Sequence, residues 1–176
     1  MSADSHKETN SSPAVYTPPE LLLECAYDFM TPTKSYVPLL DRSGFVPRDL
    51  ASVRVLAEKY AAAWSSHDPD AVASFYEENG SIIINQGDPV VGRSAISTTA
   101  AGFYAAFPDL VIHLDNFRLS GNHVLLVWTM EGKHSETGNF VKVDGWWQWT
   151  LGENLHVRES FGWFDVEDYD RQIAGG

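Results

Sequence analysis

The hydrophobic positions from residue 50 onward first follow a helical spacing. Asp49 is a suitable N-cap, and the apolar residues after it lie on one stripe of a helix. They are Leu50, Val53, Leu56, Ala57, Tyr60 and Trp64. Asp68 followed by proline predicts a second, shorter helix from Pro69 to Tyr76. A third helix is expected from Ser94 to Phe107, where Pro108 ends it.

After Pro108 the apolar residues alternate with polar ones, which is typical of strands. Four strands are predicted, at Leu110 to Leu119, Val124 to Lys133, Phe140 to Thr150 and Leu155 to Phe164. Ser81 to Asn85 forms an earlier short strand, and Asp165 caps a terminal helix over Val166 to Ile173. Helices followed by an antiparallel meander indicate an α+β domain, in which the helices cover one face of a curved antiparallel sheet.

The N-terminal residues have a different composition. Residues 1–19 are rich in Ser, Thr, Asn and Pro and are expected to form a flexible tail. Residues 20–48 are predicted to form an extension with a short helix at Leu21 to Met30. The domain itself is predicted to span residues 49–176.

Charge and cysteine content limit the partners and the cellular location that we expect for this protein. The 176 residues carry a formal net charge of −12, which argues against nucleic acid and against acidic membranes as partners. Cys25 is alone, and we find neither a secretory h-region nor an apolar stretch of membrane-spanning length, so we expect a cytoplasmic protein. His113 and Asp115 share a strand face without a third ligand, and we expect neither a metal nor a cofactor.

Short motifs along residues 50–174 resemble a known family. They include Tyr60 to Trp64, Asp68 to Ala71, Pro89 to Ile96, Phe107 to Asp109, Val127 to Thr129, Gly132 to His134 and Glu159 to Asp165. In this order they are similar to the SnoaL-like polyketide cyclases of the nuclear transport factor 2-like superfamily. The resemblance implies a cone-shaped fold, a small-molecule cavity on the concave face of the sheet, and a homodimer formed through its convex side. Because this superfamily contains enzymes and non-catalytic binders, the site must be read residue by residue.

The positions that carry acids and bases in catalytic relatives are occupied differently here. The resemblance aligns the hydrolase Arg and Asp with Trp128 and Met130, and the acid of the last strand with Gly162. The ketosteroid isomerase base falls on Asn85, and its oxyanion-hole acid falls near Gly145. Epoxide hydrolysis by the hydrolase route is therefore excluded, and proton transfer needs another group.

Two function classes stay open. In the first, His134 is the acid or base of an isomerase, cyclase or dehydratase acting on a largely apolar or aromatic substrate. The candidate substrate-binding residues are Tyr60, Trp64, Asn85, Trp128, Met130, Trp146 and Gln148. Alternation predicts that Trp147, Trp149 and Trp163 face away from the cavity, and that the first two cover either a dimer interface or the outer face of the sheet. In the second class, the domain is a non-catalytic module for ligand binding or protein interaction.

Overall fold

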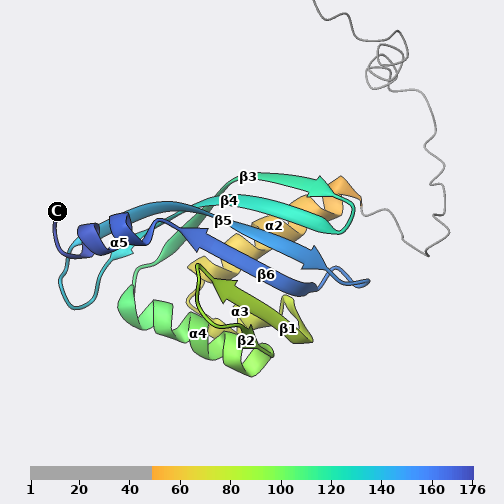
Figure 1. The fold of residues 1–176 in the computed structure, drawn as a ribbon, viewed down its shortest axis with the longest axis horizontal. Coiled ribbons are helices and arrows are strands. Elements are labelled where there is room, and N and C mark those ends of the chain that lie inside the picture. The colour runs from red at the N-terminus through yellow and green to blue at the C-terminus, as the bar shows by residue number, and fades with distance from the viewer. Residues whose placement is uncertain (1–48) are drawn as a thin grey trace, which may run out of the picture. The chain divides into compact units, whose positions relative to one another are not determined.

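A computed structural model gives the structure of the protein and describes residues 49–176. The predicted tail, the extension and the helix at Leu21 to Met30 lie outside the described residues. The described part is an α+β domain, in which helices lie against a curved, unclosed sheet of six strands (Figure 1). This is the fold class that the sequence predicts.

The three helices that precede most of the sheet form where the sequence predicts them. Helix α2 spans Leu50–Ser65, and the Asp49 carboxylate accepts hydrogen bonds from the first backbone N–H groups of the helix. Helix α4 spans Arg93–Ala106. Helix α3 is only Pro69–Ala73 and ends before the predicted Tyr76, because that residue already pairs with the sheet.

The sheet has the strand order β2-β1-β6-β5-β4-β3. The predicted meander is confirmed within one or two residues: β3 is Val111–Ser120, β4 His123–Lys133, β5 Phe140–Leu151 and β6 Val157–Phe164. After it, helix α5 spans Val166–Ile173 and is capped by Asp165 as predicted.

Strand β1 is longer than expected and has an unexpected neighbour. It spans Tyr76–Ile84, runs parallel to β6, and pairs on its other side with the short strand β2 (Val90–Val91). Gly80 lies inside β1. A Cβ at this position would stand 2.7 Å from the carbonyl oxygen of Val157, so only glycine lets the two strands approach here.

The predicted facing of β5 is wrong by one residue. Trp147 and Trp149 are buried in the core, whereas Gln148 is exposed and Trp146 is half-buried on the other face. The ladder explains this, because Trp147 pairs with the buried Leu126 of β4, and directly paired residues share a face. The inner face of β5 also carries its more apolar set of side chains, as burial requires.

Helices α2 and α4 lie on the side of the sheet that carries Trp147 and Trp149. The Tyr60 ring of α2 meets both indoles edge to face, with centroids 5.0 and 4.9 Å away. At the end of α2, the Ser65 hydroxyl accepts a hydrogen bond from the backbone N–H of Ile112 in β3. The curved sheet and the helices thus share one apolar core.

Candidate functional site

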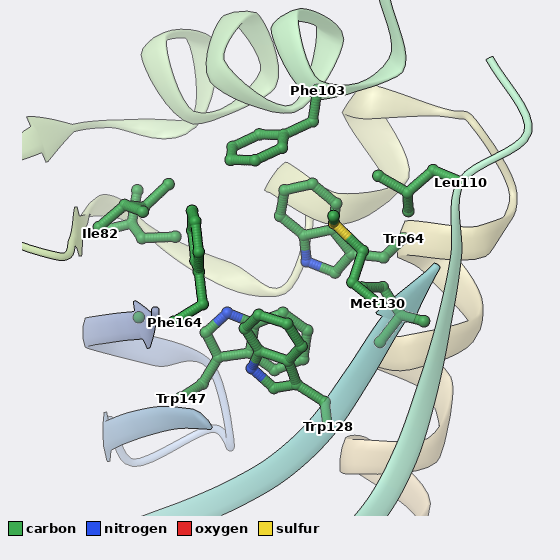
Figure 2. Close-up of a pocket in the computed structure, with 11 residues that line it drawn as sticks. Trp64, Ile82, Phe103, Leu110, Trp128, Met130, Trp147 and Phe164 are labelled. Atoms are coloured by element: carbon green, nitrogen blue, oxygen red, sulfur yellow. The ribbon is translucent and has the colours of Figure 1, made fainter. Parts of the chain in front are cut away.

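A small cavity lies in this interior, between the inner face of the sheet and helices α2 and α4 (Figure 2). Its volume is about 30 Å³. Its walls come from both helices, from the segment before β3, and from every strand except β2. The lining residues are Trp64, Ile82, Ile84, Phe103, Leu110, Ile112, Trp128, Met130, Trp147, Gly162 and Phe164. Each of these side chains is apolar or aromatic, and none of them titrates.

Five aromatic rings shape the cavity. The indoles of Trp64 and Trp147 lie nearly parallel, with centroids 6.2 Å apart and an interplanar angle of 17°. Trp128 leans on Trp147 at 5.0 Å, and Phe103 meets Trp64 edge to face at 5.7 Å. Phe164 lies 6.4 Å from Trp128 (Figure 2). Because these rings contact one another, each holds the next in place.

Two glycines provide the space for these indoles. A Cβ on Gly145 would stand 2.4 Å from the six-membered ring of Trp128, and one on Gly162 would stand 3.1 Å from Cδ1 of Trp147. Gly162 itself lines the cavity. The resemblance aligns these two positions with acids of catalytic relatives. In this structure the space where such a side chain would begin is occupied by the Trp128 and Trp147 rings.

The only polar groups of the lining side chains are indole N–H donors. The Nε1 atoms of Trp64 and Trp128 are buried and have no hydrogen-bond partner among the described residues. The Trp64 indole is close enough to the Tyr60 hydroxyl to oppose the rise in the pKa of that phenol, but it does not reach hydrogen-bond geometry. The cavity therefore presents indole donors and aromatic faces, and its one side-chain acceptor is the weak thioether sulfur of Met130.

Behind the cavity wall, two buried phenols pair with each other. The hydroxyls of Tyr60 and Tyr76 are 2.8 Å apart. Burial raises the pKa of Tyr60 well above its ordinary value and raises the pKa of Tyr76 to about 12. Both phenols are therefore neutral at physiological pH. Tyr60 supports the Trp64 and Trp147 rings from behind rather than lining the cavity.

His134 lies at the hairpin after β4 and is not one of the residues that line the cavity. Its Nδ1 is 3.3 Å from the Thr137 hydroxyl, and its ring meets Phe107 at 5.4 Å. The strand ends at Lys133, so the alternation that would turn His134 inward does not continue to it. Its acid or base role stays a prediction.

Asn85 also lies outside the cavity lining. It follows β1 with a φ of 53°, a conformation that asparagine tolerates better than most residues. Its side-chain oxygen accepts a hydrogen bond of 3.0 Å from the backbone N–H of Phe164. Asn85 thus fastens the end of β1 to the end of β6.

Of the predicted binding residues, the structure brings Trp64, Trp128 and Met130 together at the cavity. Trp146 and Gln148 face the other side of the sheet, so their predicted place at the cavity is wrong. Phe103 lies on helix α4 and was not among the predicted site residues. Phe164 and Trp147 were missed, although the alternation from Gly162 points to the first and the β4 register to the second.

Titratable groups gather instead on the outer face of the sheet. His113 is 3.1 Å from Glu131, while Asp115 accepts a hydrogen bond from Thr129. The hydrogen bond from His113 is the largest cause that lowers the pKa of Glu131. Within residues 49–176, no group of three His, Cys, Asp or Glu side chains is placed to hold a metal ion. No helix in the same range is long and apolar enough to cross a membrane.

Solved structures share this architecture. A protein with a ketosteroid isomerase-like fold from Catenulispora acidiphila, in complex with trimethylamine, is 17% identical over 68% of this chain and 92% of its own, with a TM-score of 0.64. A candidate SnoaL-like polyketide cyclase from Jannaschia sp. CCS1 is 19% identical over 77% and 98%, with a TM-score of 0.65. TsrD from Streptomyces laurentii is 17% identical over 73% and 99%, also with a TM-score of 0.65.

At these identities the likeness establishes the fold. No curated protein matches the chain. The SnoaL-like domain family matches residues 57–159, which is more than half of the chain and contains most of the residues that line the cavity. The chain therefore belongs to the SnoaL-like domain family.

Proposed function

We propose that the domain binds a small apolar molecule in its cavity without transforming it. One observation carries this proposal: none of the eleven lining residues has a side chain that can take up or release a proton near neutral pH. General acid–base chemistry needs such a group within hydrogen-bond reach of the substrate. Burial of apolar ligand surface against aromatic walls needs none.

The size of the cavity limits the ligand. At about 30 Å³ it is far smaller than the cavity of about 150 Å³ that holds benzene in a well-studied engineered protein. A larger ligand requires the walls to move. Met130 is unbranched and flexible, and Phe103 is only half-buried. These two side chains can therefore change rotamer most easily to enlarge the cavity. The trimethylamine bound by the Catenulispora neighbour has the modest size that this reasoning favours.

The proposal is tested by filling the cavity from one strand. Ile84 lines the cavity, while its neighbour Ile83 pairs with Phe161 on the outer face. We expect Ile84→Phe to abolish binding of a small apolar probe such as methylenecyclopentane, measured by tryptophan fluorescence. Ile83→Phe is the matched control and should bind normally. Equal binding by both variants would place the ligand elsewhere.

The second candidate is catalysis by His134, as an isomerase, cyclase or dehydratase. Membership of a family with polyketide cyclase-like structures favours it, as does the contact of the His134 ring with Phe107 at the end of α4. A converted substrate identified by mass spectrometry is required first. His134→Ala should then abolish turnover while leaving ligand binding intact, whereas unchanged turnover would remove His134 from the mechanism.

We also propose a homodimer through the outer face of the sheet. Four large apolar side chains there, Leu125, Val127, Phe161 and Trp163, are 37–45% exposed. Trp163 stacks on Trp146 at 6.3 Å and 17°, which makes a flat aromatic surface. Trp163→Ser should shift the sedimentation coefficient from dimer to monomer. Val91→Ser, which changes an exposed residue of β2, should leave it unchanged.

A further inference from the structure

The unpaired donors of the cavity wall bear on the class of ligand. Burying an N–H group without an acceptor is unfavourable, and native structures leave few such groups. Trp64 and Trp128 each bury one, and both line the same cavity. Figure 2 shows the Trp64 nitrogen on the side of its ring that faces Trp147 and Trp128.

Among the lining side chains only the thioether sulfur of Met130 can accept a hydrogen bond, and only weakly; neither indole N–H bonds to it or to any other described group. The Tyr60 hydroxyl, which lies close to the Trp64 indole, is already paired with the Tyr76 hydroxyl at 2.8 Å. Trp128 contacts Trp147 and Phe164, and neither ring has a lone pair to offer in its plane. An acceptor must therefore come with whatever fills the cavity.

We propose that the cavity selects a neutral molecule that carries a hydrogen-bond acceptor, such as a carbonyl or ether oxygen, which accepts from the indole N–H of Trp64 or Trp128. This inference rests on the proposed binding function and adds the chemical class of its ligand. An anion is disfavoured because no cationic side chain lines the cavity to offset its desolvation. A cation meets favourable ring faces, but the buried N–H dipoles direct their positive ends toward it.

Comparing cyclopentanone with methylenecyclopentane tests the proposal, because the two probes differ only in C=O against C=CH₂. In water the ketone is better solvated than the alkene, so a cavity without donors prefers the alkene. With a donor in the wall, we expect the ketone to bind about tenfold more tightly, which corresponds to about one recovered hydrogen bond. Tetramethylammonium serves as the cationic probe and should bind more weakly than the ketone.

The donor itself can be observed by nuclear magnetic resonance. The six tryptophans give six indole N–H signals, which single Trp→Phe variants assign. Cyclopentanone should move the proton signal of Trp64 or Trp128 downfield, and methylenecyclopentane should not. Trp149 is the matched control, because its buried N–H is also unpaired but the residue does not line the cavity. The ligand comparison uses the wild-type protein, so it stands even where a variant fails to fold.

Each outcome separates the two proposals. If the alkene or tetramethylammonium binds at least as tightly as the ketone, the acceptor class is overturned and the binding function stands. If the ketone binds best but moves neither the Trp64 nor the Trp128 signal, the assigned donors are wrong. If no probe binds, both proposals are overturned.

Discussion

Gly145→Ala adds one methyl group directly behind Trp128, a wall residue of the cavity. The added Cβ would stand 2.4 Å from Cζ2 and Cη2 of Trp128 and 2.5 Å from the carbonyl oxygen of Trp163. Carbon atoms in contact are about 3.5 Å apart, so the methyl group is about 1 Å too close on two sides. The carbonyl belongs to the paired strand β6 and cannot swing away, so relief requires shifting the sheet.

Overpacking of a core costs about 1–3 kcal/mol, occasionally more, and we expect Gly145→Ala to reach about 3 kcal/mol or more of lost unfolding free energy. For a chain of this size, that lowers the melting temperature by about 6–12 °C. Urea unfolding measures the free energy directly. The control is Gly102→Ala on helix α4, where a Cβ meets nothing within 4 Å, and which should stabilise by about 1 kcal/mol.

The double variant with Trp128→Leu separates the two contacts. Removing the indole relieves the contact with Trp128 and leaves the one with the backbone of β6, so Gly145→Ala should cost less in this background. A loss below about 1 kcal/mol in the wild-type background would show that Trp128 does not lie against Gly145, contrary to the packing described.

Three further expectations follow from hydrogen bonds and charges. The pKa of Asp49 is lowered, chiefly by the hydrogen bond that its carboxylate accepts from the backbone N–H of Ala51. The ionised carboxylate therefore stabilises the fold above the unfolded pKa of 3.8, and this contribution is lost as the pH falls below it. Asp49→Asn should make the unfolding free energy depend less on pH in this acid range. Burial raises the pKa of Tyr76 to about 12, so stability should fall as pH rises from 10 toward 12, and alkaline unfolding of Tyr76→Phe should show a smaller fall. The side-chain amide of Gln172 in α5 hydrogen-bonds to both the backbone N–H and the backbone C=O of Lys142 in β5. Gln172→Ala should therefore speed amide hydrogen exchange in α5. An unchanged exchange rate would mean that other contacts hold the helix on the sheet.

Local sequence signals predicted the elements of the fold well. Asp49, Asp68 and Asp165 are N-caps in the structure, as their spacing from the following apolar residues indicated. Alternation located β3 to β6 because each of these strands has one buried and one exposed face. Caps and periodicity act over a few residues, so a single sequence displays them directly.

Features that depend on distant partners were harder to predict. The pairing of β1 with β6 and the role of Gly80 involve residues far apart in the chain, and nothing near Gly80 signals its contact with Val157. On β5 two adjacent tryptophans make both faces look apolar, so only the register with β4 identifies Trp147 as inward. His134 lies one residue beyond β4, where alternation no longer predicts direction.

The parallel pairing of β1 with β6 also affects how the cavity forms during synthesis. Ile82 and Ile84, which line it, are held beside Ser160 and Gly162 from the last strand of the sheet. A chain still lacking β6 can form α2, α4 and the β3–β4–β5 meander from contacts between neighbours in sequence, but it leaves one wall of the cavity unbuilt. The cavity is thus completed only with the final strand, and a chain that has not yet added β6 leaves the side of Trp147 that faces Gly162 uncovered.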